Sequence, residues 1–287
     1  MSDPFGLRDL DEATLASTPG VKWQANPGRL AAWVADMDFP VAPAISERLQ
    51  AMVTRGALGY PNWGPSPSPA GRLFVDRMSS RWGWSPDLER VRDLADVLQG
   101  VRIAVELLTQ PGDPIALHTP AYHPFLNSLR EMDRRIVELP VGADRVDDVE
   151  SIIVAERPRL LILCHPHNPT GHRFDRSELE RLSAIAEAAD LVVVSDEIHA
   201  DLAHQDPSGA ETHIPFASVS ESAARRTVTV TSASKAFNLA GLRWAVMHVG
   251  HEELERRVRA FPDHFFGAPN IIAVEAALAA WTEGSEW

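Results

Sequence analysis

Residues 227–249 read TVTVTSASKAFNLAGLRWAVMHV, two short apolar runs on either side of a loop. The first run, Thr227–Thr231, is rich in β-branched residues, and the second, Trp244–Val249, is largely apolar. Short runs of this kind are typical of strands that are covered on both faces of a sheet. The loop between them carries Lys235. Ligands of open α/β sheets collect where strands end, so this loop is a candidate site.

The same alternation of short apolar runs and helical patterns extends upstream. Further strands are expected at Pro114–His118, Leu160–Cys164 and Leu191–Ser195. Helices are expected at Gly100–Leu108, Pro124–Met132, Ser177–Ala189 and Pro269–Trp281, with Ser177 as the N-cap of its helix. This alternation predicts an α/β fold with a mainly parallel sheet sandwiched by helices.

Composition and charge narrow the class of protein. The chain has 287 residues, of which 45% are hydrophobic and 23% charged, as in an ordinary globular protein with room for one large domain and part of a second. The net charge of −13 disfavours nucleic acid or an anionic membrane as a partner. The first ten residues are polar and no apolar run approaches about 18 residues, so we expect a cytoplasmic location.

Lysine is rare in this chain. Of the 27 basic residues only Lys22 and Lys235 are lysines. A lysine desolvated at a strand end has a lowered pKa, and its amine is then a nucleophile toward an aldehyde. The alternative is a loop lysine exposed to solvent. Arg243, at the start of the next strand, is suited to hold a phosphate, or else to form a salt bridge with a surface acid.

Polar side chains also follow two other expected strands. Asn168 lies in the loop HPHNPTG, residues 165–171, and Asp196 directly follows Leu191–Ser195. A carboxylate at the end of a buried strand is costly without a cationic partner, and a protonated pyridine nitrogen would be such a partner. The alternatives are a plain turn at 165–171 and a helix N-cap at Asp196. Each signal is weak alone, but together they indicate a cofactor site at one edge of the sheet.

Other enzyme classes have less support. The chain contains no G-x-G-x-x-G, no Walker A lysine motif and no G-x-S-x-G. The spacing of His165 and His167 does not favour a metal site, and none is expected. Cys164 lies within an apolar run and is interpreted as a small core residue.

Six motifs carry a resemblance to a known family: WVADMDF at 33–39, GY at 59–60, PAY at 120–122, PHNPTG at 166–171, SDEIHADL at 195–202 and SASKAFNLAGLR at 232–243. They resemble the class I/II aminotransferases, which are pyridoxal-phosphate (PLP) enzymes of fold type I. Within this family WVADMDF and DEIHADL are most similar to the MalY/PatB-like cystathionine β-lyases, which cleave C–S bonds.

The resemblance implies a role for each matching residue around pyridoxal 5'-phosphate. Lys235 would hold the cofactor as a Schiff base and move protons at the substrate α-carbon. Asp196 would pair with the ring nitrogen, Asn168 would bind the ring oxygen with His199 close by, and Tyr122 would stack on the ring.

The resemblance also implies how the cofactor phosphate is held. Gly100 and Val101 would offer backbone amides at a helix start, and Ser232 and Arg243 would complete the phosphate site. Tyr60 would reach the phosphate of the neighbouring subunit, because active sites in this family lie at the interface of a homodimer.

Three functions remain open at this point. The first is a PLP-dependent carbon–sulfur β-lyase acting on cystathionine or related cysteine S-conjugates to give a thiol, pyruvate and ammonia. The second is an aminotransferase that uses the same residues. The third, from another class, is a regulatory or partner-binding protein that keeps the PLP scaffold with little turnover.

The resemblance implies two domains. Residues 1–45 would form an N-terminal arm or part of a small domain, and residues 46–287 the large PLP-binding domain. The C-terminal part of the small domain is expected to be missing, together with the arginine that binds the substrate carboxylate. We therefore expect exposed apolar surface near Pro269–Trp281.

Overall fold

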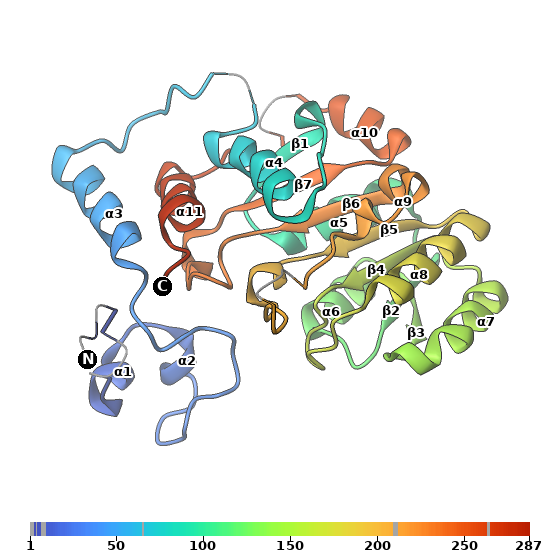
Figure 1. Cartoon of the computed structure of the whole chain (residues 1–287), viewed down its shortest axis with the longest axis horizontal. Helices are drawn as coiled ribbons and strands as arrows, with labels where there is room; N and C mark the ends of the chain where they lie inside the picture. The colour runs from blue at the N-terminus through green and yellow to red at the C-terminus, as the bar shows by residue number, and fades with distance from the viewer. Residues whose placement is uncertain (1–2, 4, 7–9, 65, 209–211, 263–264) are drawn as a thin grey trace.

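The computed structural model describes residues 3, 5–6, 10–64, 66–208, 212–262 and 265–287. Its centre is a seven-stranded sheet with the strand order β1-β7-β6-β5-β4-β2-β3 (Figure 1). The strands are β1 Val91–Leu94, β2 Pro114–His118, β3 Arg135–Leu139, β4 Leu160–Cys164, β5 Val192–Asp196, β6 Thr227–Thr231 and β7 Ala245–Val249. Strand β7 runs antiparallel to both its neighbours, and the other pairs are parallel. The prediction of a mainly parallel sheet is confirmed.

Helices cover both faces of the sheet. The α-helices are α1 Glu12–Ser17, α2 Val21–Gln24, α3 Pro43–Arg55, α4 Pro69–Trp82, α5 Val97–Leu108, α6 His123–Glu131, α7 Val146–Glu156, α8 Arg176–Ala188, α9 Glu221–Arg226, α10 Glu252–Arg259 and α11 Ile271–Glu283. Helices α5, α6 and α10 share one core with the sheet, and α7, α8 and α9 share a second core on the opposite face. A third core joins α4 and α11 to β1 and β7. None of the helices in the part of the chain that the structure describes is both long and apolar enough to cross a membrane.

The expected strands agree closely with those observed. Strands β2, β4 and β6 have the predicted bounds, while β5 and β7 each begin one residue later than expected. Strands β1 and β3 were not expected. The sequence of β3, RIVEL, alternates between exposed and buried side chains because it lies at the edge of the sheet. Its pattern therefore lacks the continuous apolar run of the central strands.

Two expectations about helix ends and surfaces are wrong. Helix α8 begins at Arg176 with Asp175 as its N-cap, and Asp175 and Glu178 form the capping box that was assigned to Ser177. Helix α11 is largely buried rather than exposed, because its alanines and Trp281 pack into the third core. Arg48 of α3 also bonds Glu275 of α11 at 2.6 Å.

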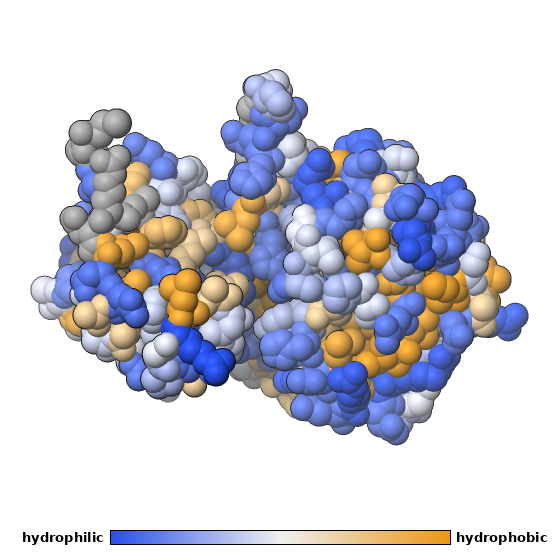
Figure 2. All heavy atoms as spheres, turned by 90° about the horizontal axis from the view of Figure 1, so that it is seen from below, coloured by the Kyte–Doolittle hydropathy of each residue, from blue (hydrophilic) through white to orange (hydrophobic). Residues whose placement is uncertain are grey.

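Exposed apolar side chains lie instead near the N-terminus. Residues 10–40, which include α1 and α2 and which we call the N-terminal module, form a lobe beside the sheet domain, with a notch between the two (Figures 1 and 2). Leu30 is 87% exposed and Trp33 is 54% exposed on this module. The predicted domain division near residue 45 stays a prediction.

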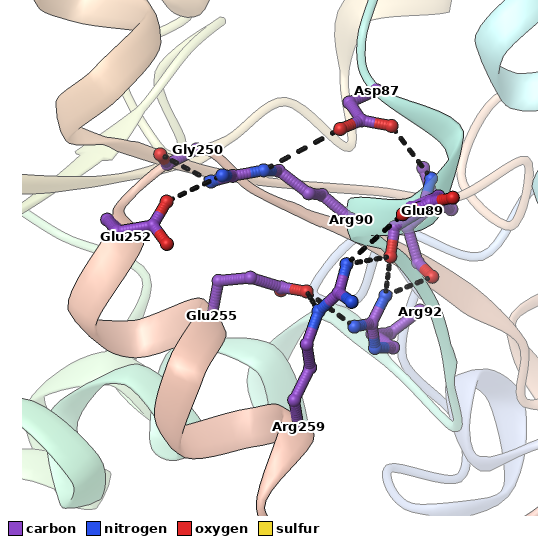
Figure 3. A network of polar contacts seen from close by, with 9 residues as sticks. Asp87, Glu89, Arg90, Arg92, Gly250, Glu252, Glu255 and Arg259 are labelled. Atoms are coloured by element: carbon purple, nitrogen blue, oxygen red, sulfur yellow. Dashed lines mark hydrogen bonds and ion pairs between the residues drawn. The ribbon is translucent and has the colours of Figure 1, made fainter.

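A network of ion pairs fastens strand β1 to helix α10 (Figure 3). Glu255 is buried and receives hydrogen bonds from Arg92 at 2.7 Å and from Arg259 at 2.5 Å. Arg90, next to β1, donates to the Gly250 carbonyl and to the Glu252 carboxylate. The network holds the edge strand β1 in place, and β1 leads directly to the start of helix α5.

Candidate cofactor site

The sheet topology brings the expected site residues to one edge. Strands β2, β4, β5 and β6 are parallel, so their carboxyl ends lie on the same side. Strand β7 is antiparallel to β6, so its first residues return to that side, and the end of β1 lies beside them. The loops that carry Tyr122, Asn168, His199, Lys235 and Arg243 therefore all leave this edge.

Asp196 is the last residue of β5 and only 2% of its surface is exposed. Its Oδ1 accepts a hydrogen bond from the amide of Ile198 at 3.1 Å. Burial raises the pKa of Asp196 to about 7, and the neighbouring Glu197 contributes to the rise, while Lys235 opposes it. A nearby cation would lower this raised pKa and favour the ionised form of the carboxyl group.

Glu197 is held firmly just beyond Asp196. Its carboxylate accepts hydrogen bonds from the Ser195 hydroxyl at 2.8 Å and from the Phe216 amide at 3.0 Å, and it lies 3.0 Å from Nε2 of His213. These contacts fix the chain on both sides of Asp196. The acid at the sheet edge is therefore rigidly placed.

Lys235 lies in a tight turn that follows β6. The Phe237 amide donates to the Ala233 carbonyl at 3.1 Å and closes this turn. The Lys235 side chain is partly buried, and its charge acts on both Asp196 and His199. Burial lowers the pKa of His199, and the charge of Lys235 lowers it further. The amine, the acid and the imidazole thus share one electrostatic environment.

Tyr122 and Asn168 lie at the ends of the neighbouring strands. Burial raises the pKa of Tyr122, and the charge of Asp196 adds to the rise, so the ring lies within electrostatic range of that acid. Asn168 is partly buried, and its backbone amide nitrogen lies 3.5 Å from Sγ of Cys164. Cys164 is opposite Asp196 in the β4–β5 pair, and burial raises the pKa of its thiol. This supports its interpretation as a core residue rather than a nucleophile.

The start of helix α5 lies at the same edge. Asp96 is the N-cap, and its carboxylate accepts from the amide of Gln99 at 2.7 Å and from the Arg243 guanidinium. Arg243 is 58% exposed there. Asp96 neutralises Arg243 in this structure, and a phosphate that took over the contact with Arg243 would also lie at the amino end of helix α5, which suits an anion.

The helix register corrects one part of the predicted phosphate site. Gly100 and Val101 are the fourth and fifth residues of α5, and amides at these positions bond to carbonyls within the helix. The amides left for an anion are one turn earlier, at Val97 and Leu98. Gly100 serves packing instead, because a Cβ there would lie 2.6 Å from Val230.

Ser232 and Tyr60 were also expected near the cofactor phosphate, but in this structure one shapes a turn and the other is exposed. The Ser232 hydroxyl donates to the Trp244 carbonyl at 2.6 Å and accepts from the Ser234 amide at 3.0 Å, so it shapes the turn before Lys235. Tyr60 is fully exposed on the extended segment 56–64 after α3. Its contact with a second subunit stays a prediction.

The residues present at this edge fit pyridoxal phosphate. The buried acid Asp196 suits a protonated ring nitrogen, the corner formed by Arg243 and the start of α5 suits a phosphate, and Lys235 suits the aldehyde. The other lysine, Lys22, is 11% exposed and lies in an ion pair with Asp38 at 2.7 Å, so its amine is already engaged.

Sequence reasoning missed the role of Asp96. An aspartate three residues before Gln99 and followed by an apolar run is a recognisable N-terminal cap, and the structure shows this cap. A helix begun after Asp96 would have indicated Val97 and Leu98 as the residues whose amides have no partner within the helix.

The sequence of this chain is similar to one known family of proteins. A family model described as aminotransferase class I and II matches residues 97–286. A cystathionine beta-lyase of Corynebacterium glutamicum is 32% identical over 268 residues, which cover 93% of this chain and 70% of the relative.

Solved structures agree with this result. A putative PLP-dependent beta-cystathionase of Corynebacterium diphtheriae aligns with a TM-score of 0.85 and 28% identity, covering 96% of this chain and 72% of that one. A PLP-bound C-S lyase of Staphylococcus hominis aligns with a TM-score of 0.84 and 28% identity, covering 97% and 70%. The chain thus spans about 70% of the length of the proteins that it matches.

Proposed function

The chain belongs to the class I and II aminotransferase family, and from this premise we propose that it is a PLP-dependent carbon–sulfur β-lyase. Its substrates would be cystathionine or related cysteine S-conjugates, and its products a thiol, pyruvate and ammonia. The structural observation that carries the proposal is the placement of a buried acid, Asp196, within electrostatic range of Lys235, which lies in the turn after the adjacent strand β6. The names of the most similar relatives favour lyase chemistry over transamination.

Each part of the cofactor would be held by a different strand end. Lys235 would bind the aldehyde covalently, Asp196 would face the ring nitrogen, and Asn168 would bind the ring oxygen, with Tyr122 against the ring and His199 nearby. Arg243 and the amides of Val97 and Leu98 would hold the phosphate, while Ser232 would support the turn before Lys235.

Lys235 and Asp196 would have different roles in the reaction. When bound, pyridoxal phosphate supplies a sink for the electron pair left at the substrate α-carbon. Lys235 would be the base that removes the α-proton. The electron pair at the α-carbon would form a Cα=Cβ double bond as the Cβ–S bond breaks, and the sulfur would leave with its bonding pair as a thiolate. Asp196 would favour the protonated form of the ring nitrogen.

A homodimer in the cytoplasm is part of the proposal. Tyr60 is fully exposed and lies outside the cluster at the sheet edge, which suits a contact with the partner's cofactor phosphate. Sedimentation of the purified protein at micromolar concentration should give twice the mass of the chain. A monomer that binds and turns over its substrate would contradict this part of the proposal.

The test of the activity is a product balance. The purified protein, loaded with pyridoxal phosphate, is incubated with cystathionine and no keto acid. We expect thiol, pyruvate and ammonia in equal amounts, and no products from Lys235→Ala. Amino-group transfer that requires a keto-acid acceptor would instead identify an aminotransferase. A bound cofactor with no turnover of any amino acid would favour the regulatory alternative.

A further inference from the structure

The N-terminal module is joined to the cofactor turn by one side chain. The Asn238 carboxamide accepts a hydrogen bond from the Met37 amide at 3.1 Å and donates to the carbonyls of Met37 at 3.2 Å and Phe39 at 3.1 Å. The carboxamide thus bonds the backbone of segment 37–39 much as a neighbouring strand would. These bonds connect parts of the chain that are about 200 residues apart in sequence.

Segment 36–39 is itself locked within the module. Lys22 donates to the Asp36 carbonyl at 2.6 Å and to the Asp38 carboxylate at 2.7 Å, and the indole N–H of Trp23 donates to the same carboxylate at 2.8 Å. Trp33 in turn donates to the Lys22 carbonyl at 2.9 Å. These bonds tie segment 36–39 to helix α2 and to Trp33, so a shift of the segment would disturb these parts of the module as well.

Asn238 lies in the same turn as Lys235, three positions further along the chain. The Phe237 amide closes this turn on the Ala233 carbonyl. The backbone of Asn238 is left-handed, with φ of 55°, a conformation that asparagine tolerates better than most residues. Asparagine at position 238 therefore both tolerates the left-handed backbone and supplies the side chain that bonds Met37 and Phe39.

We propose that Asn238 is a positioning residue that fixes segment 36–39 against the turn that carries Lys235 and so sets how an amino-acid substrate is held at this turn. The inference rests on the proposed function for its substrate but on geometry for the contact itself. Loss of the three bonds frees the N-terminal module to shift while the turn keeps Lys235 in place. Substrate binding then suffers more than covalent attachment of the cofactor.

Two substitutions separate the roles of the residue. Asn238→Gly keeps the left-handed backbone and removes the side chain. Asn238→Asp keeps the acceptor for the Met37 amide but loses both donors and places a carboxylate against two carbonyls. Asn127→Asp, at an exposed asparagine of α6, is the matched control.

The experiment measures amide hydrogen exchange and kinetics on the purified holoenzyme. In both Asn238 variants we expect the amides of residues 36–39 to exchange at least about tenfold faster, since several net hydrogen bonds are lost. We expect KM for cystathionine to rise about tenfold with kcat changed less than about threefold, because the lost contacts position substrate rather than act on it. Borohydride should still fix the cofactor on Lys235, and the control should match the unaltered protein.

Either of two results would overturn the inference. One is unchanged amide exchange of residues 36–39 in Asn238→Gly. The other is a fall in kcat with unchanged KM and loss of the cofactor from Lys235, which would indicate damage to the turn alone. If the unaltered protein turns over no amino acid, the proposed function fails, and the exchange measurement by itself decides whether Asn238 holds the module.

Discussion

Burial raises the pKa of Asp196 to about 7, and the positive charge of Lys235, from the turn after the next strand, acts in the opposite direction. The two groups stand at the carboxyl ends of adjacent parallel strands. A ring cation placed against Asp196 would restore its charge and offset the cost of burying it. The arrangement is unfavourable for the empty protein and favourable for the protein with its cofactor.

The variant Asp196→Asn should therefore stabilise the cofactor-free protein. The pKa of this acid is raised from 3.8 to about 7, so the folded state holds its proton while the unfolded state has lost it. Stability from this group falls as the pH rises from about 4 to 7 and stays low above 7. We expect the variant to gain roughly 1–4 kcal/mol in urea unfolding at pH 8 and less at pH 5. A loss of stability at pH 8, or a gain that grows at pH 5, would contradict this.

Arg243→Ala should weaken cofactor binding. Removing one charge-assisted contact to a phosphate should raise the dissociation constant of pyridoxal phosphate by about tenfold or more. Arg225→Ala on α9, at an arginine that is 68% exposed, is the control and should bind normally. The measurement is a spectroscopic titration of the cofactor-free protein. Equal affinities in the two variants would remove Arg243 from the phosphate site.

His248 should make the protein sensitive to acid. Burial lowers its pKa from 6.5 to about 4, so protonation is resisted in the folded state. Stability from this group is complete above pH 6.5 and is lost as the pH falls toward 4. His248→Phe keeps the edge contact with Trp84 and removes the titration. The variant should gain about 2 kcal/mol relative to the unaltered protein when the pH is lowered from 7 to 5. Parallel pH profiles in urea unfolding would contradict this.

Glu255 should matter for stability and not for catalysis. Its buried carboxylate joins Arg92 and Arg259 (Figure 3), so Glu255→Ala leaves two guanidinium groups without their shared partner. We expect a loss of about 2–3 kcal/mol in urea unfolding. Glu252→Ala removes an 80% exposed partner of Arg90 and should cost less than about 1 kcal/mol. Equal costs for the two variants would show that burial of Glu255 adds nothing.

The central strands could be predicted from sequence because both their faces are buried. A short, continuous apolar run such as LLILC at 160–164 is typical of a strand that is covered on both faces. Strands β1 and β3 lie at the two edges, where polar side chains face solvent and interrupt the apolar pattern. The residues that follow the central strands were expected at one edge because parallel strands end together, and the structure brings their loops to one edge.

Contacts between distant segments could not be predicted in this way. The pairing of Arg243 with Asp96 depends on β7 returning antiparallel beside β6, and a single sequence does not indicate that direction. The contact between Asn238 and Met37 joins segments 201 residues apart, and no local pattern records it. Gly100 was assigned to the phosphate because the start of α5 was placed one turn too late.

The most direct test of the cofactor site is the identity of the lysine that binds pyridoxal phosphate. The loaded protein is reduced with borohydride, digested and mapped by mass spectrometry. We expect the reduced cofactor on Lys235 and not on Lys22, which is engaged by Asp38, and no label on Lys235→Ala. Label on Lys22, or label that persists in Lys235→Ala, would contradict it.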